Sequence, residues 1–303
     1  MPPKPEVIRR QLSVHLARTC NLYCEYCQAP PDGGCQGRAE IKAAIKKGGY
    51  TAVSLEGGGE PTTAPDLFEW IAFLKSCGIK SFMLSTNAVA LADPALARRL
   101  RFIHSFIVNF PACDERTYKK VTRSVKFPLA LKGLENLRAL GLAGRVRLFH
   151  IISAHNYTRL PAFADWVAKS YPEAGFVNFI FMRNVGRAAS SRENLLPTYT
   201  RAMPRLKIAL AKLKLKGIKC VIQNTPLCVL GSFRGFSFEL QRWRRGDPVL
   251  PHNAAPKAKL PACAKCRLEP ACCGARPDYL AVHGSRELSA QDLDPASIKP
   301  EAF

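Results

Sequence analysis

The feature that most constrains this chain of 303 residues is a group of three cysteines near its start. Cys20, Cys24 and Cys27 follow the spacing C-x3-C-x2-C. Three thiolates on one short loop can each bind one iron of a cubic iron–sulfur cluster. The fourth iron then has no protein ligand and can bind a substrate or a cofactor. The spacing therefore predicts a cluster that takes part in chemistry, whereas a fully ligated cluster only carries electrons.

Zinc and disulfide bonds are the alternatives for these cysteines. Structural zinc takes four ligands, commonly from two C-x2-C pairs, and this loop offers three thiols. A disulfide framework is not expected in a chain of this length without a secretion signal. The spacing favours an open cluster and leaves zinc as the competing interpretation.

The chain around and beyond the loop alternates apolar stretches with amphipathic segments. Strands are expected at residues 11–17, from 53 into the glycine turn 57–59, and at 81–84, 104–110, 146–152 and 176–181. Helices are expected at 65–76, 129–140, 160–169 and 199–216, with a basic helical segment after the fourth strand. Repeated strand–helix units predict an α/β fold with a parallel sheet and right-handed crossovers. Six units make a partial (β/α)6 TIM-like barrel, whose active-site groups lie at the carboxyl ends of the strands.

Three further motifs follow predicted strands. Gly58-Gly59-Glu60 comes after the second strand, Ser85-Thr86-Asn87 after the third, and Gly186-Arg187-Ala188 after the sixth. In this order, with the cysteine loop after the first strand, the chain resembles the radical S-adenosylmethionine (radical SAM) enzymes. The resemblance covers about the first 220 residues.

The resemblance implies how S-adenosylmethionine (SAM) binds. The open iron binds the amino and carboxylate groups of its methionine half, which the backbone at Gly58 and Gly59 approaches closely because glycine has no side chain. Glu60, or alternatively Glu56, accepts a hydrogen bond from the ammonium group. The competing interpretation of the glycine turn is an ordinary connection from strand to helix.

Four other residues complete the implied cofactor site. Ser85 and Asn87 offer donors and acceptors for the ribose hydroxyls or the carboxylate. Tyr26 occupies the place where the family has an aromatic residue beside the adenine. Arg187 pairs with the carboxylate, or is instead a structural or solvent-facing arginine.

A second group of cysteines lies in the last 80 or so residues. Cys228 precedes Cys263, Cys266 and Cys272. This arrangement resembles the SPASM and twitch extensions of radical SAM enzymes, which implies one auxiliary [4Fe-4S] cluster held by these four residues, with Cys273 as a substitute for Cys272. A zinc ribbon or knuckle is the alternative, since C-x2-C pairs also suit zinc.

The expected domain organisation is a radical SAM partial barrel at 8–222 and an auxiliary-cluster domain at 223–303. Within the second domain we expect a loop at 231–260 and a short hairpin that includes residues 279–282. Of the remaining cysteines, Cys77 and Cys220 are expected to be buried small hydrophobic residues, and Cys35 a free thiol in a loop.

Composition limits the class of protein and its partners. Lys and Arg total 45 against 23 Asp and Glu, a net charge of +22. Such a field attracts RNA, an acidic leader peptide or a phosphorylated metabolite, or is simply a solvated surface. No stretch of about 18 apolar residues is present, and the start of the sequence lacks an apolar signal segment, so we expect a cytoplasmic protein without a membrane span.

The resemblance implies an enzyme, a radical SAM oxidoreductase or maturase. It cleaves SAM reductively at a [4Fe-4S] cluster, with electrons from a donor such as flavodoxin or ferredoxin, and abstracts a hydrogen atom from its substrate. The expected substrate is a peptide or protein. RNA or a small metabolite is the alternative among enzymes, and a non-catalytic, zinc-bearing nucleic-acid-binding protein is the alternative from another class.

Overall fold

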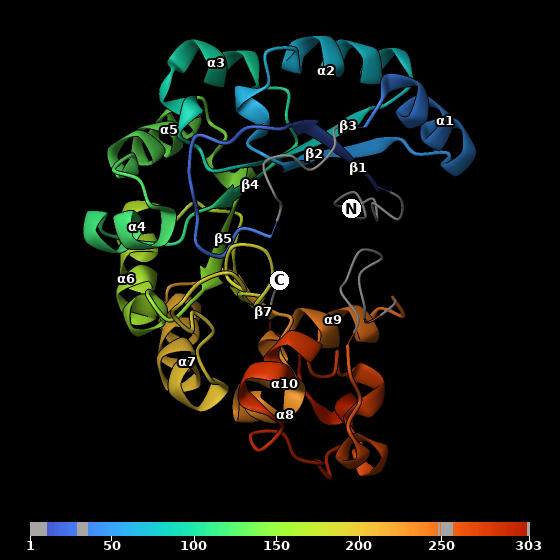
Figure 1. Ribbon diagram of the computed structural model, residues 1–303, viewed down its shortest axis with the longest axis vertical. Helices are drawn as coiled ribbons and strands as arrows, with labels where there is room; N and C mark the ends of the chain where they lie inside the picture. Colours follow the sequence, from blue (N-terminus) through green and yellow to red (C-terminus); the bar gives the residue numbers. More distant parts are fainter. Residues whose placement is uncertain (1–10, 29–35, 248, 250–256, 302–303) are drawn as a thin grey trace. The chain divides into compact units, whose positions relative to one another are not determined.

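A computed structural model describes residues 11–28, 36–247, 249 and 257–301 (Figure 1). The chain divides into two compact units. The first comprises Met1–Tyr23, Ala29–Asn109 and Ser124–Arg147, and the second comprises Cys24–Gln28, Phe110–Arg123 and Leu148–Phe303. This division does not test the predicted domain boundary after residue 222, which stays a prediction.

In the described part of the chain, seven strands form the sheet in the order of the sequence. They are β1 (Gln11–Ala17), β2 (Ala52–Gly58), β3 (Ser81–Thr86), β4 (Ser105–Asn109), β5 (Val146–Ile152), β6 (Phe176–Phe181) and β7 (Cys220–Gln223). The pairs β1–β2, β2–β3, β3–β4 and β6–β7 are parallel. Helices follow the strands, which confirms the predicted α/β class, and β7 adds one strand to the six predicted strand–helix units.

The first unit is a parallel sheet covered by helices. Its helices are α1 (Arg38–Gly48), α2 (Leu67–Ser76), α3 (Pro94–Arg99) and α5 (Phe127–Ala139). In Figure 1, α1 and α2 lie along the same side of β1, β2 and β3. Leu74 of α2 and Val53, Leu55 and Leu84 of the strands are fully buried. Leu67, Trp70, Ile71 and Leu74 are the buried residues of α2, so this face of the helix forms part of the core.

The second unit contains the remaining helices and the C-terminal segment. They are α4 (Glu115–Thr122), α6 (Leu160–Ser170), α7 (Tyr199–Leu215), α8 (Leu227–Leu230), α9 (Phe238–Arg244) and α10 (Pro277–His283). Glu287 accepts hydrogen bonds from the backbone amides of Tyr199 and Thr200 at the start of α7, and from the hydroxyl of Tyr279. A carboxylate at a helix N-terminus is favourable because it meets unpaired N–H groups. The C-terminal segment is thereby fastened to a helix of the α/β fold.

The predicted hairpin at 279–282 is wrong, because these residues belong to α10. Pro277 stands in the first turn, where its missing N–H costs nothing, and Gly284 ends the helix with a φ of 69°. Tyr279 stacks on Tyr199 with ring centroids 4.1 Å apart. A short apolar run does not distinguish a strand from a buried helix, and packing on α7 decides this one.

The prediction of a loop at 231–260 is also partly wrong. Residues Gly231–Phe236 form a 3-10 helix and α9 follows it. Ser237 begins α9 by accepting a hydrogen bond from the backbone amide of Leu240 at 3.2 Å, as helix-capping serines do. Residues 248 and 250–256 of the predicted loop lie outside the described residues.

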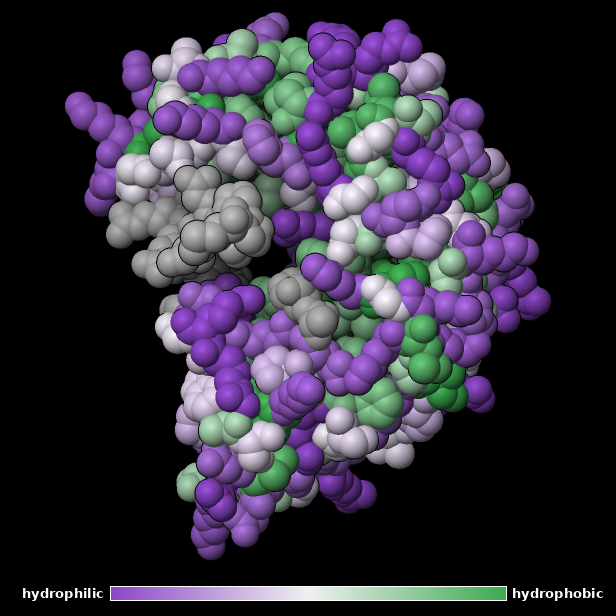
Figure 2. Space-filling model, turned by 180° about the vertical axis from the view of Figure 1, so that it is seen from behind, coloured by the Kyte–Doolittle hydropathy of each residue, from purple (hydrophilic) through white to green (hydrophobic). Residues whose placement is uncertain are grey.

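None of the helices in the described part of the chain has the length and apolar character needed to cross a membrane. Figure 2 shows hydrophilic side chains over most of the face that it presents, with smaller hydrophobic patches between them. This surface agrees with the large excess of basic residues in the sequence.

His150 gives the second unit a specific response to acid. Its ring is buried against Phe163 and Phe179, its Nδ1 lies 3.2 Å from the carbonyl oxygen of Phe110, and its Nε2 has no hydrogen-bond partner among the described residues. Burial lowers the pKa of this imidazole to about 3. An unfolded chain has an ordinary histidine pKa near 6.5. Between this pH and about 3, the histidine is therefore protonated in the unfolded chain and neutral in the folded chain.

We expect this histidine to destabilise the fold as the pH falls from about 6.5 towards 3. Between pH 7 and pH 5 the loss is about 2 kcal/mol. Urea unfolding of His150→Leu at both pH values should show a free energy of unfolding that falls by about 2 kcal/mol less than that of the wild type. An equal fall in the two proteins would show that His150 is not the responsible group.

Candidate active site

The three N-terminal cysteines lie on the loop that follows β1. Cys20 is exposed, whereas Cys24 and Cys27 are partly buried. The backbone amide of Leu22 lies 3.4 Å from the Cys20 sulfur, and the Cys27 amide donates to the Cys24 carbonyl at 3.2 Å. An N–H group directed at sulfur stabilises a thiolate, which is the form that binds metal. The loop passes from the first unit to the second between Tyr23 and Cys24.

In the first unit, the glycine turn at the end of β2 packs against the beginning of this loop. A Cβ atom on Gly59 would lie 1.9 Å from the Thr19 carbonyl oxygen, so only glycine fits there. The backbone amide of Glu60 donates to the same carbonyl at 2.8 Å. Gly58 has a φ of 53°, a left-handed conformation that favours glycine. The sequence motif is thus required by the close approach of two backbones.

Glu60 is buried within the turn rather than directed into open space. Its Oε1 accepts hydrogen bonds from the Thr62 and Thr86 hydroxyls at 2.6 and 2.7 Å, and its Oε2 accepts one from the Asn87 amide at 2.7 Å. Burial raises the pKa of this carboxyl, and the hydrogen bonds oppose that effect. Glu60 therefore joins the ends of β2 and β3.

Asn87 brings the end of β3 to the first cysteine. Its side-chain amide donates to Asn21 Oδ1 at 2.7 Å and lies 3.9 Å from the Cys20 sulfur. Ser85 lies beside Glu56, with 3.5 Å between the hydroxyl and the carboxylate. Two polar residues of the motif after the third strand are thus placed: Asn87 lies next to the cysteine loop, and Ser85 lies next to the second strand. Glu56 is less buried than Glu60 and has fewer donors.

In the second unit, Gly186 and Arg187 pack against the later part of the cysteine loop. A Cβ atom on Gly186 would lie 2.5 Å from the Cys27 carbonyl oxygen, and φ at Gly186 is 58°. The Arg187 amide donates to the Cys27 carbonyl at 3.2 Å, and its guanidinium lies 3.5 Å from the Cys24 carbonyl oxygen. Arg187 thus positions the loop backbone. Tyr26 is buried, with 6% of its surface exposed.

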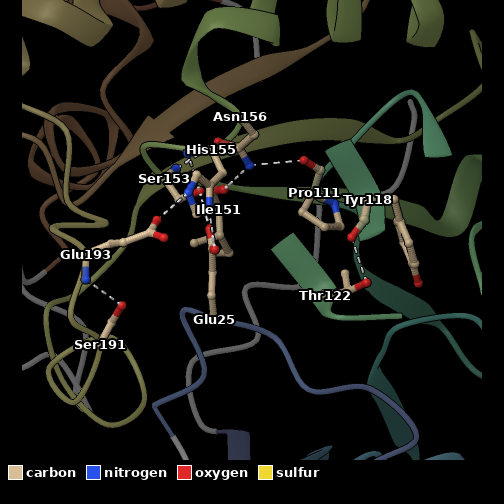
Figure 3. A network of polar contacts seen from close by, with 10 residues as sticks. All are labelled: Glu25, Pro111, Tyr118, Thr122, Ile151, Ser153, His155, Asn156, Ser191 and Glu193. Carbon is tan, nitrogen blue, oxygen red and sulfur yellow. Dashed lines mark hydrogen bonds and ion pairs between the residues drawn. The ribbon is translucent and has the colours of Figure 1, made fainter. Parts of the chain in front are cut away.

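A polar network that the sequence analysis missed holds the same loop (Figure 3). Glu25, between Cys24 and Tyr26, is 5% exposed. Its carboxylate accepts a hydrogen bond from the Ser153 hydroxyl at 2.7 Å and lies 2.5 Å from Nδ1 of His155. The other ring nitrogen of His155 lies 3.0 Å from Glu193. Their place in the sequence could have indicated these residues. Ser153 to His155 directly follow β5, as the other motifs follow their strands.

The surroundings of Glu25 make it a positioning residue for the cysteine loop. Glu25→Ala removes the acceptor of the buried Ser153 hydroxyl and the partner of His155 Nδ1. Mutating a group that orients metal ligands typically lowers metal affinity or activity about 10- to 100-fold. We therefore expect iron content and SAM cleavage after reconstitution to fall by about 10-fold or more. Glu25→Gln keeps an acceptor for Ser153 and should recover part of the loss.

Glu193→Gln is the matched control for this prediction. Glu193 contacts the same histidine, but its side chain is 66% exposed. Exposed ion pairs contribute little, so iron content should stay near that of the wild type. If Glu25→Ala binds iron as well as Glu193→Gln does, Glu25 does not position the loop.

The four C-terminal cysteines predicted as ligands line one apolar, largely enclosed pocket in the second unit. Cys228, Cys263, Cys266 and Cys272 all contribute to its wall. The backbone amides of Leu227 and Gly274 each lie 3.4 Å from the Cys272 sulfur, and the Gln291 amide lies 3.4 Å from the Cys266 sulfur. Such N–H groups around sulfur are typical of iron–sulfur sites.

The pocket distinguishes between the two adjacent cysteines. Cys273 is 2% exposed, does not line the pocket, and has its sulfur 3.3 Å from the Gly274 carbonyl oxygen. A hydrogen bond from the Cys273 thiol, helped by backbone amides, lowers the pKa of Cys272 to about 6, and the pKa of Cys273 is raised. Cys272 therefore lines the pocket with the other three cysteines, and Cys273 is buried outside the pocket lining.

Among the described residues, no three Cys, His, Asp or Glu side chains come close enough to hold one metal ion. A cubic cluster binds each cysteine to a different iron, so its ligands stand further apart than those of a single ion. Cys220 is buried, as predicted, and Cys77 is partly buried. Cys35 lies outside the described residues.

The comparisons with known proteins agree with the fold and the motifs. Residues 14–167, just over half of the chain, match the family model of the radical SAM superfamily. The chain belongs to this superfamily. Membership implies a [4Fe-4S] cluster and SAM as cofactors, and it makes the protein a radical SAM enzyme.

Curated relatives match part of the chain. A probable GTP 3′,8-cyclase of Saccharolobus islandicus is 27% identical over 151 residues, which are 48% of this chain and 48% of the relative. A probable GTP 3′,8-cyclase of Methanococcus maripaludis is 26% identical over 181 residues, 57% of this chain and 60% of the relative. The chain thus spans about half the length of the curated relatives it matches.

Solved structures share the fold at low sequence identity. The structure of anSMEcpe with bound AdoMet and Cp18Cys peptide has a TM-score of 0.57 at 17% identity and covers 79% of this chain and 67% of its own. Streptococcus suis SuiB has a TM-score of 0.56 at 13% identity, covering 74% of this chain and 50% of its own. The α/β architecture is therefore that of the radical SAM partial barrels.

Proposed function

We propose that Cys20, Cys24 and Cys27 hold a [4Fe-4S] cluster whose fourth iron binds SAM. The observation that carries this proposal is the contact, within the first unit, of the Gly59 turn and Asn87 with the beginning of the cysteine loop. When bound and reduced, the cluster and SAM supply a 5′-deoxyadenosyl radical that removes a hydrogen atom from the substrate. A flavodoxin or ferredoxin is the proposed electron donor.

The protein residues bind and orient this cofactor. Gly58 and Gly59 offer unhindered backbone to the methionine half. Glu56 is the better acceptor for its ammonium group on the side of β2, because three donors already occupy Oε1 of Glu60 and one occupies Oε2. Ser85 and Asn87 offer polar groups at the end of β3. In the second unit, Arg187 supports the loop and Tyr26 is the proposed neighbour of the adenine.

We propose that Cys228, Cys263, Cys266 and Cys272 hold an auxiliary [4Fe-4S] cluster in a SPASM- or twitch-like domain. Their common pocket and the amide groups at two of the sulfurs support this assignment. A cluster held there would supply an electron acceptor or a binding point for the substrate. Because extensions of this kind often accompany peptide modification, the proposed substrate is a peptide or protein, and the enzyme a maturase.

A phosphorylated nucleotide is the second candidate substrate, since the curated relatives bear the name GTP 3′,8-cyclase. The two candidates separate in one experiment. Reconstituted, dithionite-reduced protein should form 5′-deoxyadenosine from SAM under anaerobic conditions, detected by mass spectrometry. Faster formation with a peptide encoded beside the gene supports maturation, whereas faster formation with GTP, together with GTP consumption, contradicts it.

A further inference from the structure

Helix α4 carries three basic residues on one face, and a fourth, Arg123, follows directly as its C-cap. Arg116, Lys119, Lys120 and Arg123 are exposed and follow the spacing i, i+3, i+4, i+7, whereas Tyr118 and other residues of the opposite face are buried. The four side chains line an open hollow of about 390 Å³, and no other described residue contributes to it. At a rise of 1.5 Å per residue, this basic stripe is about 10 Å long.

The charges of the basic stripe are concentrated on one short helix and its C-cap. No acidic side chain of the described residues pairs with any of the four, and Glu115 of the same helix does not line the hollow. Some basic groups elsewhere are paired, among them two lysines of α7 and the residue that follows α9. Lys212 bonds to Asp165, Lys214 to Glu301, and Arg245 to Asp247. A concentrated, uncompensated charge attracts an anionic partner.

The basic stripe is connected to the cysteine loop. The carbonyl oxygen of Val121, on α4, accepts a hydrogen bond of 2.9 Å from the backbone amide of Glu25. Glu25 lies between Cys24 and Cys27, which are proposed to hold the catalytic cluster. At the other end of α4, Asp114 caps the helix by accepting a hydrogen bond from the Thr117 amide. Asp114 also forms an ion pair with Arg159. The C-terminal end of α4, next to Arg123, therefore contacts the loop that is proposed to carry the chemistry.

We propose that the basic stripe of α4 docks an acidic segment of the peptide substrate. This inference rests on the proposed function and adds a recognition surface to it. An extended peptide rises about 3.4 Å per residue and directs alternate side chains to the same side, about 7 Å apart. Two or three alternating Asp or Glu residues therefore match a stripe of this length. Held there, the following residues of the peptide have a short path to the cysteine loop.

The stripe suits a peptide better than a nucleic acid. Proteins that bind single strands combine a cationic groove with aromatic side chains on which bases stack. The hollow has no aromatic lining, because Tyr118 faces the core. Recognition of double-stranded RNA covers a much longer surface than one short helix offers.

Fluorescence anisotropy tests the proposal with the full-length protein. The probes are a fluorescein-labelled heptapeptide that alternates glycine and aspartate, its counterpart with asparagine, and an oligouridylate of similar length. The variant Arg116→Gln, Lys119→Gln, Lys120→Gln removes three charges and keeps Arg123, whose left-handed backbone ends α4. Lys42→Gln, Lys46→Gln, Lys47→Gln on exposed positions of α1 removes the same charge elsewhere.

The aspartate peptide should bind in a salt-sensitive manner and about 10-fold more weakly to the α4 variant, while the α1 variant binds like the wild type. Equal weakening by both variants, no binding of the peptide, or binding of oligouridylate in its place would overturn the proposal. Thermal unfolding of both variants shows that they fold. If the wild type forms no 5′-deoxyadenosine, the proposed function fails; if it does and the peptide ignores α4, this inference alone fails.

Discussion

Replacing Cys24 by alanine should abolish the formation of 5′-deoxyadenosine from SAM. Cys24 is the central member of the proposed ligand set, and two thiols cannot hold three irons of the cluster. The loss should exceed the 10- to 100-fold effect usual for residues that only orient ligands, so we expect a decrease of at least about 100-fold. The assay is mass spectrometry of 5′-deoxyadenosine after anaerobic reconstitution and reduction with dithionite.

Cys77→Ala is the control for this experiment. Cys77 is partly buried at the end of α2 and far in sequence from both proposed ligand sets. It should retain full activity and iron content. Equal SAM cleavage by Cys24→Ala and Cys77→Ala would remove Cys24 from the ligand set.

The second large effect is expected at the C-terminal pocket. Cys263→Ala should lower iron from about eight to about four atoms per chain, because each cubic cluster holds four irons. The first cluster remains, so SAM cleavage without a substrate should persist while substrate modification is lost. Iron and sulfide analysis of the reconstituted protein measures the first effect directly.

The adjacent cysteines provide a close control. Cys273→Ala removes a thiol that the structure buries outside the pocket, and it should keep about eight irons per chain. Cys272→Ala should behave like Cys263→Ala. If loss of Cys273 and not of Cys272 removes the iron, the proposed ligand is the wrong one of the two. Zinc in place of iron would contradict both clusters.

Much of this architecture could be predicted because most of its strand–helix units have a clear local pattern. Strands β1, β5 and β6 occur with the predicted bounds, since a short apolar run followed by a turn and an amphipathic segment specifies a strand–helix unit. The Gly59 turn could be predicted from its glycines alone. The structure gives the reason for them, because a Cβ atom on Gly59 would lie 1.9 Å from a backbone carbonyl oxygen. The cysteine spacing belongs to the same class of local signal.

Long-range packing accounts for what the sequence did not reveal. Residues 279–282 form part of a helix because Tyr279 stacks on Tyr199, about 80 positions earlier. Glu25 contacts Ser153 and His155, which lie about 130 positions later in the sequence. No local sequence pattern predicts these contacts. The burial of Glu60 among Thr62, Thr86 and Asn87 likewise follows from the pairing of β2 with β3.

The measurement that tests the central claim most directly is electron paramagnetic resonance of the reduced Cys263→Ala protein, with and without SAM. This variant leaves the first cluster as the source of the signal. If one iron of that cluster is open to SAM, adding SAM should change the g-values of the reduced cluster. An identical spectrum with and without SAM, or a protein that binds zinc and no iron, would contradict the account.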